Sequence, residues 1–553
     1  MKDLMAGIIV GIVALPLAIA FGIASGVTPE KGIITAIVAG FIISALGGSK
    51  VQIGGPTGAF IVIIYGIVSD PAYGLQGLLI ATMMAGVILI ALGVFKLGAV
   101  IKFIPYPIII GFTAGIAVTI FTTQVGDVLG LTQQAISESG EAITVPLKTP
   151  GDFIGKWICY AKNISTFNLW NFIVAIGSLL VIIFSPMALK RVPVLNKIPG
   201  SLYGILVGTL AVLVLKSQFG MEGIDTIGDR FDIQAQLPDM VVPSFTFDTL
   251  QNLLPVAFTI AILGAIESLL SAAVADGAIG DRHDSNTELV AQGVANVVTP
   301  LFGGIPATGA IARTMTNINN GGRTPIAGII HAIVLVLILL VLMPYAKFIP
   351  MATLAAVLLI VSYNMSEWRT IKRLMKDPKS DVTVLLVTFF LTVIFDLTIA
   401  IEIGLVIACV LFIKRVMETT EISVIENEIH PSEDTDERLS IPEGCAVYEI
   451  NGPYFFGIAN KFEELESVLK AGHRPKVQII RMRRVPFIDS TGIHNLTTLV
   501  EMNHEKGTEV ILSGITPKVQ KQLLKANFHK VLGSKNFCNN IDEALHRAKE
   551  LLA

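Results

Sequence analysis

The sequence predicts a polytopic α-helical membrane protein that ends in a soluble α/β domain, and three observations carry this prediction. The chain of 553 residues is 53% hydrophobic and only 15% charged, whereas soluble domains carry about 25% charged residues. Its mean hydropathy is +0.71. The charge is uneven, because apolar runs dominate as far as about residue 412 and charged residues crowd the remainder at the density of a soluble domain.

The membrane part divides into apolar runs that are separated by charged or Gly/Pro-rich breaks, and these runs form two sets of seven. The first set covers residues 4–24, 30–47, 58–68, 75–95, 103–123, 169–187 and 199–216, and the second covers 251–275, 286–302, 309–318, 325–345, 349–362, 381–396 and 398–413. The equal count predicts two repeats, at about 4–216 and 251–413, within a membrane domain of residues 1–415. A linker is predicted at 416–444 and the soluble domain at 445–553.

The third run of each set is short and begins on a similar glycine- and proline-rich break. The first reads GGPTGAFIVII from Gly54, and the second reads GGIPATGAIARTMTNI from Gly303. A helical span needs about 20 apolar residues, so neither run is long enough to cross a bilayer. Short, broken segments at corresponding positions of two repeats indicate a transporter's substrate site. The alternative is a pair of packing or re-entrant segments that bind no ligand.

A helix that begins inside the membrane provides a binding site for an anion. Its first N–H groups have no partner within the helix, and its dipole adds about half a positive charge at that end. Two such helices of opposite direction bring both positive ends to one point. We therefore predict a site for a small anion, formed by Thr57, Gly58, Ala59, Thr308, Gly309, Ala310, Ile311, Ala312 and Arg313.

Each residue type in this set has an expected role. The glycines let the backbone approach the ligand closely, and the hydroxyls of Thr57 and Thr308 donate hydrogen bonds. Arg313 either brings a positive charge near the ligand or forms a structural ion pair.

Glu267 is an acidic residue inside an apolar run. A carboxylate within the membrane is costly unless it is paired, protonated or next to a cation path, so a functional role is the default interpretation. We predict that Glu267 couples transport to an ion or gates it. Ser271 lies one helical turn later on the same face and is predicted to help hold the ion. The alternative is that Glu267 is a structural partner of Arg313.

Lysine and arginine residues indicate how the chain is oriented. If the number of spans is even, both termini lie on the same side of the membrane, and lysine and arginine gather in the loops on that side. The long loop 218–248, on the opposite side, is acidic. Both termini, and with them the soluble domain, are therefore predicted to lie in the cytoplasm, and the membrane is predicted to be the bacterial inner membrane.

Several function classes are not predicted. The four cysteines lack the spacing of a metal site or a disulfide framework, and they are Cys159, Cys409, Cys445 and Cys538. No set of nucleophile, base and orienting group is recognisable, so an enzyme is not predicted. Neither a metal, a cofactor nor a nucleic-acid partner is expected.

The soluble domain alternates strands and helices, which is typical of an α/β domain. Strands are predicted within 446–457, 476–482 and 509–515, and helices within 460–472 and 487–507. The segment IDSTG at the start of the second helix places Asp489 where it caps the helix.

Residues 276–328, DGAIGDRHDSNTELVAQGVANVVTPLFGGIPATGAIARTMTNINNGGRTPIAG, closely resemble the signature region of the sulfate permease family, SulP, whose animal members are solute carrier family 26. GIVALPLAIAFGIASG at 11–26 and FIPYPIIIGFTAGIAV at 103–118 resemble its first and fifth helices. The tail resembles its sulfate transporter and anti-sigma factor antagonist (STAS) domain.

This resemblance implies fourteen transmembrane segments in two inverted repeats, divided into a core and a gate domain, in a homodimer that works by an elevator-like motion. It also implies that the third and tenth segments flank the anion. Ser490 matches the serine that is phosphorylated in soluble STAS proteins, so it is a candidate regulatory phosphosite, and the STAS domain is a candidate docking site for a cytoplasmic regulatory partner.

The family carries sulfate, bicarbonate, chloride and dicarboxylates on one scaffold, so the resemblance leaves the anion open. In its sodium-dependent bicarbonate members an aspartate and a threonine stand at the positions of Glu267 and Ser271, and a threonine stands near Ile311. The longer acid, the smaller hydroxyl residue and the missing third oxygen weaken a Na⁺ site here. We therefore expect proton-coupled uptake of sulfate.

Several alternatives to this expectation stay open. They are Na⁺- or H⁺-coupled symport of bicarbonate, symport of a dicarboxylate, an uncoupled exchanger or channel, and a membrane signalling protein whose output is the STAS domain.

Overall fold

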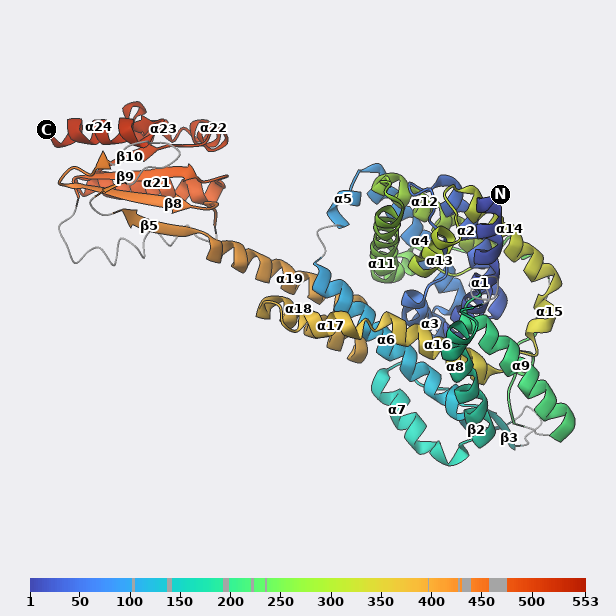
Figure 1. Ribbon diagram of the computed structural model, residues 1–553. Coiled ribbons are helices and arrows are strands. Elements are labelled where there is room, and N and C mark those ends of the chain that lie inside the picture. Colours follow the sequence, from blue (N-terminus) through green and yellow to red (C-terminus); the bar gives the residue numbers. More distant parts are fainter. Residues whose placement is uncertain are drawn as a thin grey trace. The chain divides into compact units, whose positions relative to one another are not determined.

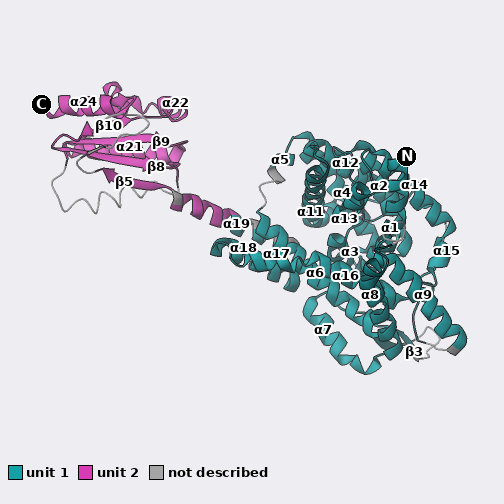
Figure 2. Ribbon diagram, in the orientation of Figure 1, with its two compact units in different colours: residues 1–408 teal, residues 409–553 magenta. Residues whose placement is uncertain are grey.

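The structure is a computed structural model, and it describes residues 1–101, 105–136, 142–191, 198–219, 223–233, 236–395, 397–425, 428–429, 439–456 and 475–553. These residues form two compact units, 1–408 and 409–553 (Figure 2). The first unit is mainly helical, and the second is built around a five-stranded sheet (Figure 1).

The first half of the membrane unit contains a helix in each of its seven predicted runs: α1 (Lys2–Ala24), α2 (Pro29–Leu46), α3 (Ile61–Ser69), α4 (Gly74–Val94), α6 (Tyr106–Leu129), α8 (Leu169–Ala188) and α9 (Gly200–Phe219). Shorter elements connect them, and these are β1 (Gly54–Gly55), η1 (Gly58–Phe60), α5 (Gly98–Ile101), the hairpin β2 (Thr132–Ile136) and β3 (Ala142–Pro146), α7 (Phe153–Lys162) and η2 (Ile164–Thr166).

The second half contains the other seven: α11 (Phe247–Ile279), α12 (Ser285–Val298), α13 (Ile311–Asn319), α14 (Ile326–Val341), α16 (Met351–Met365), α18 (Lys379–Ile394) and α19 (Leu397–Thr419). The connecting elements are α10 (Ile227–Arg230), η4 (Thr299–Phe302), β4 (Thr308–Gly309), α15 (Met343–Ala346) and α17 (Trp368–Leu374). Eight of the described helices are long and apolar enough to cross a membrane. The number of crossings, fourteen, therefore stays a prediction.

Helix packing is reciprocal between the two halves. Helix α4, the fourth of its set, packs against α11 and α12, the first two of the other set, and α14 packs against α1 and α2 in the same way. Likewise α6 packs against α18, and α8 packs against α16. Helices α4 and α12 meet at Gly86 and Gly293, where a Cβ on either residue would lie 2.6 Å from the other's carbonyl oxygen. Such small residues let helices approach closely within a membrane.

The second unit has strand order β11-β10-β9-β8-β5, in which β8, β9, β10 and β11 run parallel and β5 runs antiparallel to β8. The strands are β5 (Glu421–Ile425), β8 (Cys445–Asn451), β9 (Val477–Arg484), β10 (Glu509–Ser513) and β11 (Phe537–Cys538). Outside this sheet, β6 (Glu428–Ile429) pairs with β7 (Leu439–Ser440). The range predicted as a linker, 416–444, thus includes one strand of the main sheet.

Helices cover both faces of this sheet. The core on one face includes side chains of α21 (Ser490–Glu505), α22 (Pro517–Lys525) and α23 (His529–Leu532), and the core on the other includes those of α24 (Ile541–Leu552). A short turn of helix, η5 (Ser534–Asn536), precedes the last strand. The helix predicted at 460–472 lies outside the described residues.

Candidate functional site

The two glycine-rich breaks lie side by side, although about 250 residues separate them in the sequence. Strand β1 pairs with β4 in antiparallel register, with Gly54 opposite Gly309 and Gly55 opposite Thr308. The N–H of Ala310 continues the pairing by donating to the Ile53 carbonyl at 2.9 Å. This pairing gives partners to extended backbone groups inside a membrane body, where no water would satisfy them. The short helices α3 and α13 therefore begin next to each other.

No side chain caps either helix start. Thr57 precedes η1 and α3 with an extended backbone, and its side chain makes no capping hydrogen bond. Ala310 precedes α13 and has no side chain able to cap it. Gly58 and Ala59 are buried behind the first start, whereas Ile311 and Ala312 are exposed at the second. Uncapped N–H groups of this kind are suited to an anion.

Arg313 lies behind the crossing and connects the two breaks. Its side chain is 2% exposed, and its Nη2 donates to the Pro56 carbonyl at 2.9 Å. Gly55 has φ +154°, and a Cβ on Gly55 would lie 2.1 Å from Arg313 Nη1. The guanidinium therefore fills the space that a side chain at residue 55 would need. Within the described residues Nη1 has no hydrogen-bond partner.

Glu267 reaches the start of the first short helix. Its Oε2 accepts a hydrogen bond of 2.8 Å from the Thr57 hydroxyl, and the carboxylate is half-buried. The described contacts of Glu267 and Arg313 include no ion pair between them. Glu267 is thus a partner of the first break rather than of Arg313.

Ser271 contacts the second short helix. Its hydroxyl donates to Thr314 Oγ1 at 3.4 Å, and the same oxygen accepts from the Ile53 N–H at 3.0 Å. Helix α11 therefore contacts the first break through Glu267 and the second through Ser271.

Thr308 and Gly309 contact protein groups at the crossing. Thr308 is fully buried, and its hydroxyl donates to the Gly264 carbonyl at 2.8 Å. A Cβ on Gly309 would lie 1.8 Å from Gln52 Nε2, so the Gln52 amide covers this glycine. At Gly58 a Cβ would meet only the Met365 thioether within 3 Å. Residues 55 and 309 are therefore glycines because the side chains of Arg313 and Gln52 occupy the space that a Cβ would need. The sequence analysis had instead explained such glycines by the close approach of a ligand.

The sequence analysis missed Glu288, another acidic residue inside a predicted apolar run. It lies on α12, is fully buried, and accepts hydrogen bonds from Gln52 and Ser268. The rule that singled out Glu267 also applied to it, because residue 288 stands inside the predicted apolar run 286–302.

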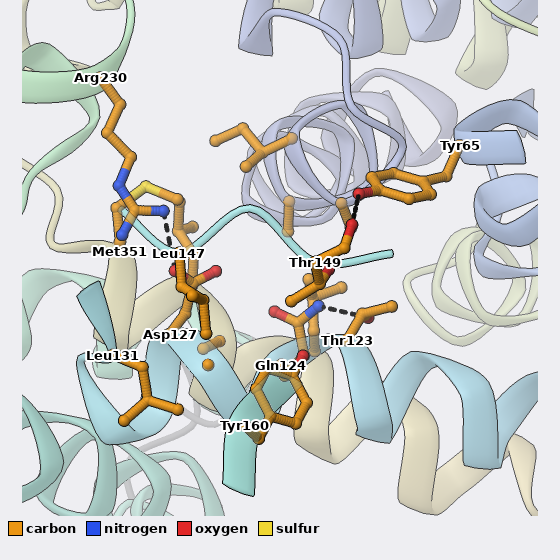
Figure 3. Close-up of a pocket in the computed structure, with 17 residues that line it drawn as sticks. Tyr65, Thr123, Gln124, Asp127, Leu131, Leu147, Thr149, Tyr160, Arg230 and Met351 are labelled. Atoms are coloured by element: carbon orange, nitrogen blue, oxygen red, sulfur yellow. Dashed lines mark hydrogen bonds and ion pairs between the residues drawn. The ribbon is translucent and has the colours of Figure 1, made fainter. Parts of the chain in front are cut away.

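A separate cavity of about 140 Å³ lies among the ends of α1, α3 and α6 and the start of α16 (Figure 3). None of the predicted site residues lines it. Arg230 beside it is held by Asp127 at 2.8 Å and Asp225 at 3.0 Å. Its positive charge is therefore neutralised by two carboxylates, which makes this cavity a poor match for an anion.

Tyr65 on α3 closes one side of this cavity. Its hydroxyl donates to the Thr149 carbonyl at 3.3 Å (Figure 3), and the Lys156 ammonium lies 5.3 Å from the centre of its ring. Burial lowers the pKa of Lys156, and the nearby charge of Asp152 opposes this shift. Tyr65 thus ties the end of the first short helix to the segment around β3 and α7.

Comparison with protein families gives two matches. The model described as the sulfate permease family matches residues 1–388, and the model of the STAS domain matches residues 438–544. The chain belongs to the sulfate permease family. The resemblance read from residues 276–328 is confirmed, and so is the fold class of a helical membrane protein followed by a STAS domain.

Two curated relatives cover nearly the whole chain. A protein of Bacillus subtilis (strain 168) named "Putative sulfate transporter YvdB" is 42% identical over 546 residues, which are 98% of this chain and 96% of the relative. A protein of Synechocystis sp. named "Bicarbonate transporter BicA" is 31% identical over 559 residues, which are 99% of this chain and 94% of the relative. This sulfate permease family member is therefore an anion transporter and not an enzyme, as predicted.

Solved structures agree with this assignment. The transmembrane domain of a cyanobacterial bicarbonate transporter BicA is 31% identical, with a TM-score of 0.61 over 74% of this chain and 97% of that chain. The structure of SLC26A9 aligns with a TM-score of 0.83 over 99% of this chain and 90% of that chain. Its sequence identity of 18% makes it evidence for the fold alone. The protein is a multi-pass membrane transporter of the sulfate permease family.

Proposed function

We propose that this transporter takes up sulfate, or a similar small oxyanion, together with protons by an elevator-type motion. The anion would bind at the uncapped starts of α3 and α13, with the buried charge of Arg313 behind them. Backbone N–H groups and a fixed cation suit an oxyanion, because they supply several hydrogen-bond donors and a positive charge. The relative that is 42% identical is named as a sulfate transporter, which favours sulfate over bicarbonate.

One observation carries the coupling proposal, namely the hydrogen bond from Thr57 to Glu267. It places a carboxylate beside one of the two helix starts that would hold the anion. An ionised Glu267 would repel the bound anion, and a protonated Glu267 would not. Proton and anion would therefore bind together, which is the requirement for symport.

The same geometry favours H⁺ over Na⁺ as the coupling ion. A hard cation needs several oxygen ligands. The Ser271 hydroxyl, which was expected to help, is directed to Thr314. Glu267 and Thr57 then offer few oxygens to a metal ion but are sufficient for a proton.

The test is uptake into proteoliposomes of sulfate, bicarbonate or fumarate, each under a separately imposed proton or Na⁺ gradient. We expect sulfate to accumulate under the proton gradient and Glu267→Gln to abolish that accumulation. Asp248→Asn, which removes an exposed acid of the same helix, serves as the control and should behave like the wild type. Concentrative uptake by Glu267→Gln would show that this carboxylate is not the coupling group.

Other outcomes of this assay identify the alternatives. Accumulation of bicarbonate instead would change the substrate and agree with the relatives that are named bicarbonate transporters, and accumulation of fumarate would indicate a dicarboxylate symporter. A substrate that equilibrates but never accumulates would indicate an uncoupled exchanger or channel. No flux of any anion would support a signalling role for the STAS domain.

We also propose a homodimer with both termini in the cytoplasm and regulation through the STAS domain. Ser490 is exposed at the first position of α21, where Asp489 caps the helix by accepting from the Gly492 N–H at 2.7 Å. A phosphate there would add about two negative charges at a helix start and alter what the domain binds. Phosphopeptide mapping of protein from its native host, with Ser490→Ala as the control, tests this proposal.

A further inference from the structure

Glu288 is the most fully hydrogen-bonded acid of the described membrane unit, yet no cation bonds to it. Its side chain is fully buried on α12. Oε1 accepts from Gln52 Nε2 at 3.0 Å, from Ser268 Oγ at 3.2 Å and from Gln292 Nε2 at 2.8 Å. Oε2 accepts from the Ser49 N–H at 3.1 Å. Four neutral donors thus hold both oxygens of the carboxyl group.

These donors come from three segments that are distant from one another in the sequence. Ser49 and Gln52 belong to the link between α2 and β1, Ser268 belongs to α11, and Gln292 lies one turn further along α12. Gln52 Nε2 also donates to Ser268 Oγ at 2.9 Å, so the contacts form one closed network. Such a network fixes the relative position of its members.

The network reaches the candidate anion site at two points. The Gln52 amide lies against Gly309, whose Cβ position is 1.8 Å from Gln52 Nε2, and residue 309 pairs with Gly54 across the two breaks. Ser268 directly follows Glu267, whose carboxylate holds Thr57. A single carboxylate is therefore connected to the backbone crossing and to the proposed coupling residue.

We propose that Glu288 is a positioning residue for transport, whose carboxyl group holds the Gln52 amide over Gly309 and thereby fixes where the two helix starts meet. This inference rests on the proposed anion site at those helix starts. It does not depend on which anion binds or on proton coupling. Loss of the carboxylate frees Gln52, and the backbone N–H groups at residues 309–312 then lose their fixed relation to residues 57–59.

The test compares Glu288→Gln with a swapped double variant, Gln52→Glu combined with Glu288→Gln. Counterflow of labelled sulfate measures KM and maximal rate without any ion gradient. We expect Glu288→Gln to raise KM roughly 10- to 100-fold, the effect of losing hydrogen bonds to a charged group, with a smaller change in maximal rate. The swapped variant restores one carboxylate facing one amide and should recover most of the lost affinity.

Gln292→Leu is the matched control, because it removes a donor to Glu288 on the same helix without touching Gln52 or Ser268. Its KM should change by about threefold or less. Gln52→Met covers the case in which Glu288→Gln does not fold, since it removes the group that Glu288 positions and should raise KM by itself. Unchanged KM in Gln52→Met, or equal KM increases in Gln292→Leu and Glu288→Gln without recovery in the swapped variant, would overturn the proposal.

Failure of this inference is distinguishable from failure of the proposed function. If the wild type exchanges labelled bicarbonate or fumarate but not sulfate, the proposed substrate is wrong. The same variants are then compared with the anion that is exchanged, and the predicted order of KM values is unchanged.

Discussion

The two short helices occupy equivalent places in the two halves of the transporter but differ in composition and in the contacts that they make. Helix α3 reads IVIIYGIVS and is apolar, whereas α13 reads IARTMTNIN and is largely polar. Side chains of α13 bind the backbone that leads into α3: Arg313 contacts the Pro56 carbonyl, Thr314 the Ile53 N–H and Asn317 the Val51 carbonyl at 2.9 Å. At the start of α3 the corresponding side-chain contact is that of Thr57 with Glu267.

This difference indicates that α3 and α13 have different roles, although they occupy equivalent positions in the two repeats. The second short helix organises the backbone of the first break and supplies a fixed charge, and the first connects the site to the acid that is proposed to couple transport. Two repeats can thus differ in their contributions to binding and coupling while both keep the paired helix starts. Substitutions in α13 should accordingly reduce binding and stability, and loss of the Thr57 hydroxyl at the start of α3 should affect coupling.

The largest effect is expected for Arg313→Gln. The variant loses a charge-assisted hydrogen bond to Pro56, worth about 1.5–3 kcal/mol, and the positive charge behind the anion. Counterflow of labelled sulfate should fall roughly 10- to 100-fold in the ratio of maximal rate to KM. Arg313→Lys keeps the charge but not the planar donors, so it should recover only part of the activity. Wild-type counterflow in Arg313→Gln would refute the role of this cation.

A pair of glycine substitutions compares the two breaks directly. Gly309→Ala places a methyl group 1.8 Å from the buried Gln52 amide, which Glu288 holds in place. Gly58→Ala places one 2.8 Å from the flexible end of Met365. We expect Gly309→Ala to abolish most counterflow and Gly58→Ala to retain more than about half, because a thioether moves more cheaply than a fixed amide. The opposite order would show that the ligand approaches residue 58 more closely than residue 309.

Much of this arrangement could be predicted from the sequence, because its signals are local. The repeated Gly, Pro and Thr-Gly-Ala pattern at the breaks predicted the paired short helices, and a lone acid in an apolar run predicted a role for Glu267. The strand–helix alternation predicted the α/β fold of the tail. Each of these signals is a pattern within short segments, which can be compared or followed in order along the chain without knowing any contact between them.

The remaining features depend on contacts between distant segments. The Gln52 amide fills the space next to Gly309, and no pattern within either break reveals this contact. The side chain of Arg313 extends toward Pro56, which periodicity along α13 cannot show. Strand β5 lies in the range predicted as a linker. Its five residues pair with the more distant β8, and the local sequence does not show this pairing.

A stability measurement tests whether α13 organises the first break. Thr314→Val removes the acceptor of the Ile53 N–H, which leaves a buried backbone donor without a partner. We expect a loss of about 1–3 kcal/mol in the free energy of unfolding, seen as a lower melting temperature in detergent. Thr316→Val is the control on the same helix, because its hydroxyl is exposed and, among the described residues, bonds within α13 to the Ala312 carbonyl. Equal melting temperatures for the two variants would contradict the organising role of Thr314.

A moderate effect is expected at Thr57, the contact that distinguishes coupling from binding. Thr57→Val removes the hydroxyl that donates to Glu267, while Thr57→Ser keeps it. Because Glu267 is half-buried, water can replace part of the lost hydrogen bond. Proton-driven uptake by Thr57→Val should therefore fall by about three- to tenfold, with counterflow reduced less, and Thr57→Ser should match the wild type. If counterflow falls as far as driven uptake, Thr57 acts on the anion itself, and both short helices then contribute to binding.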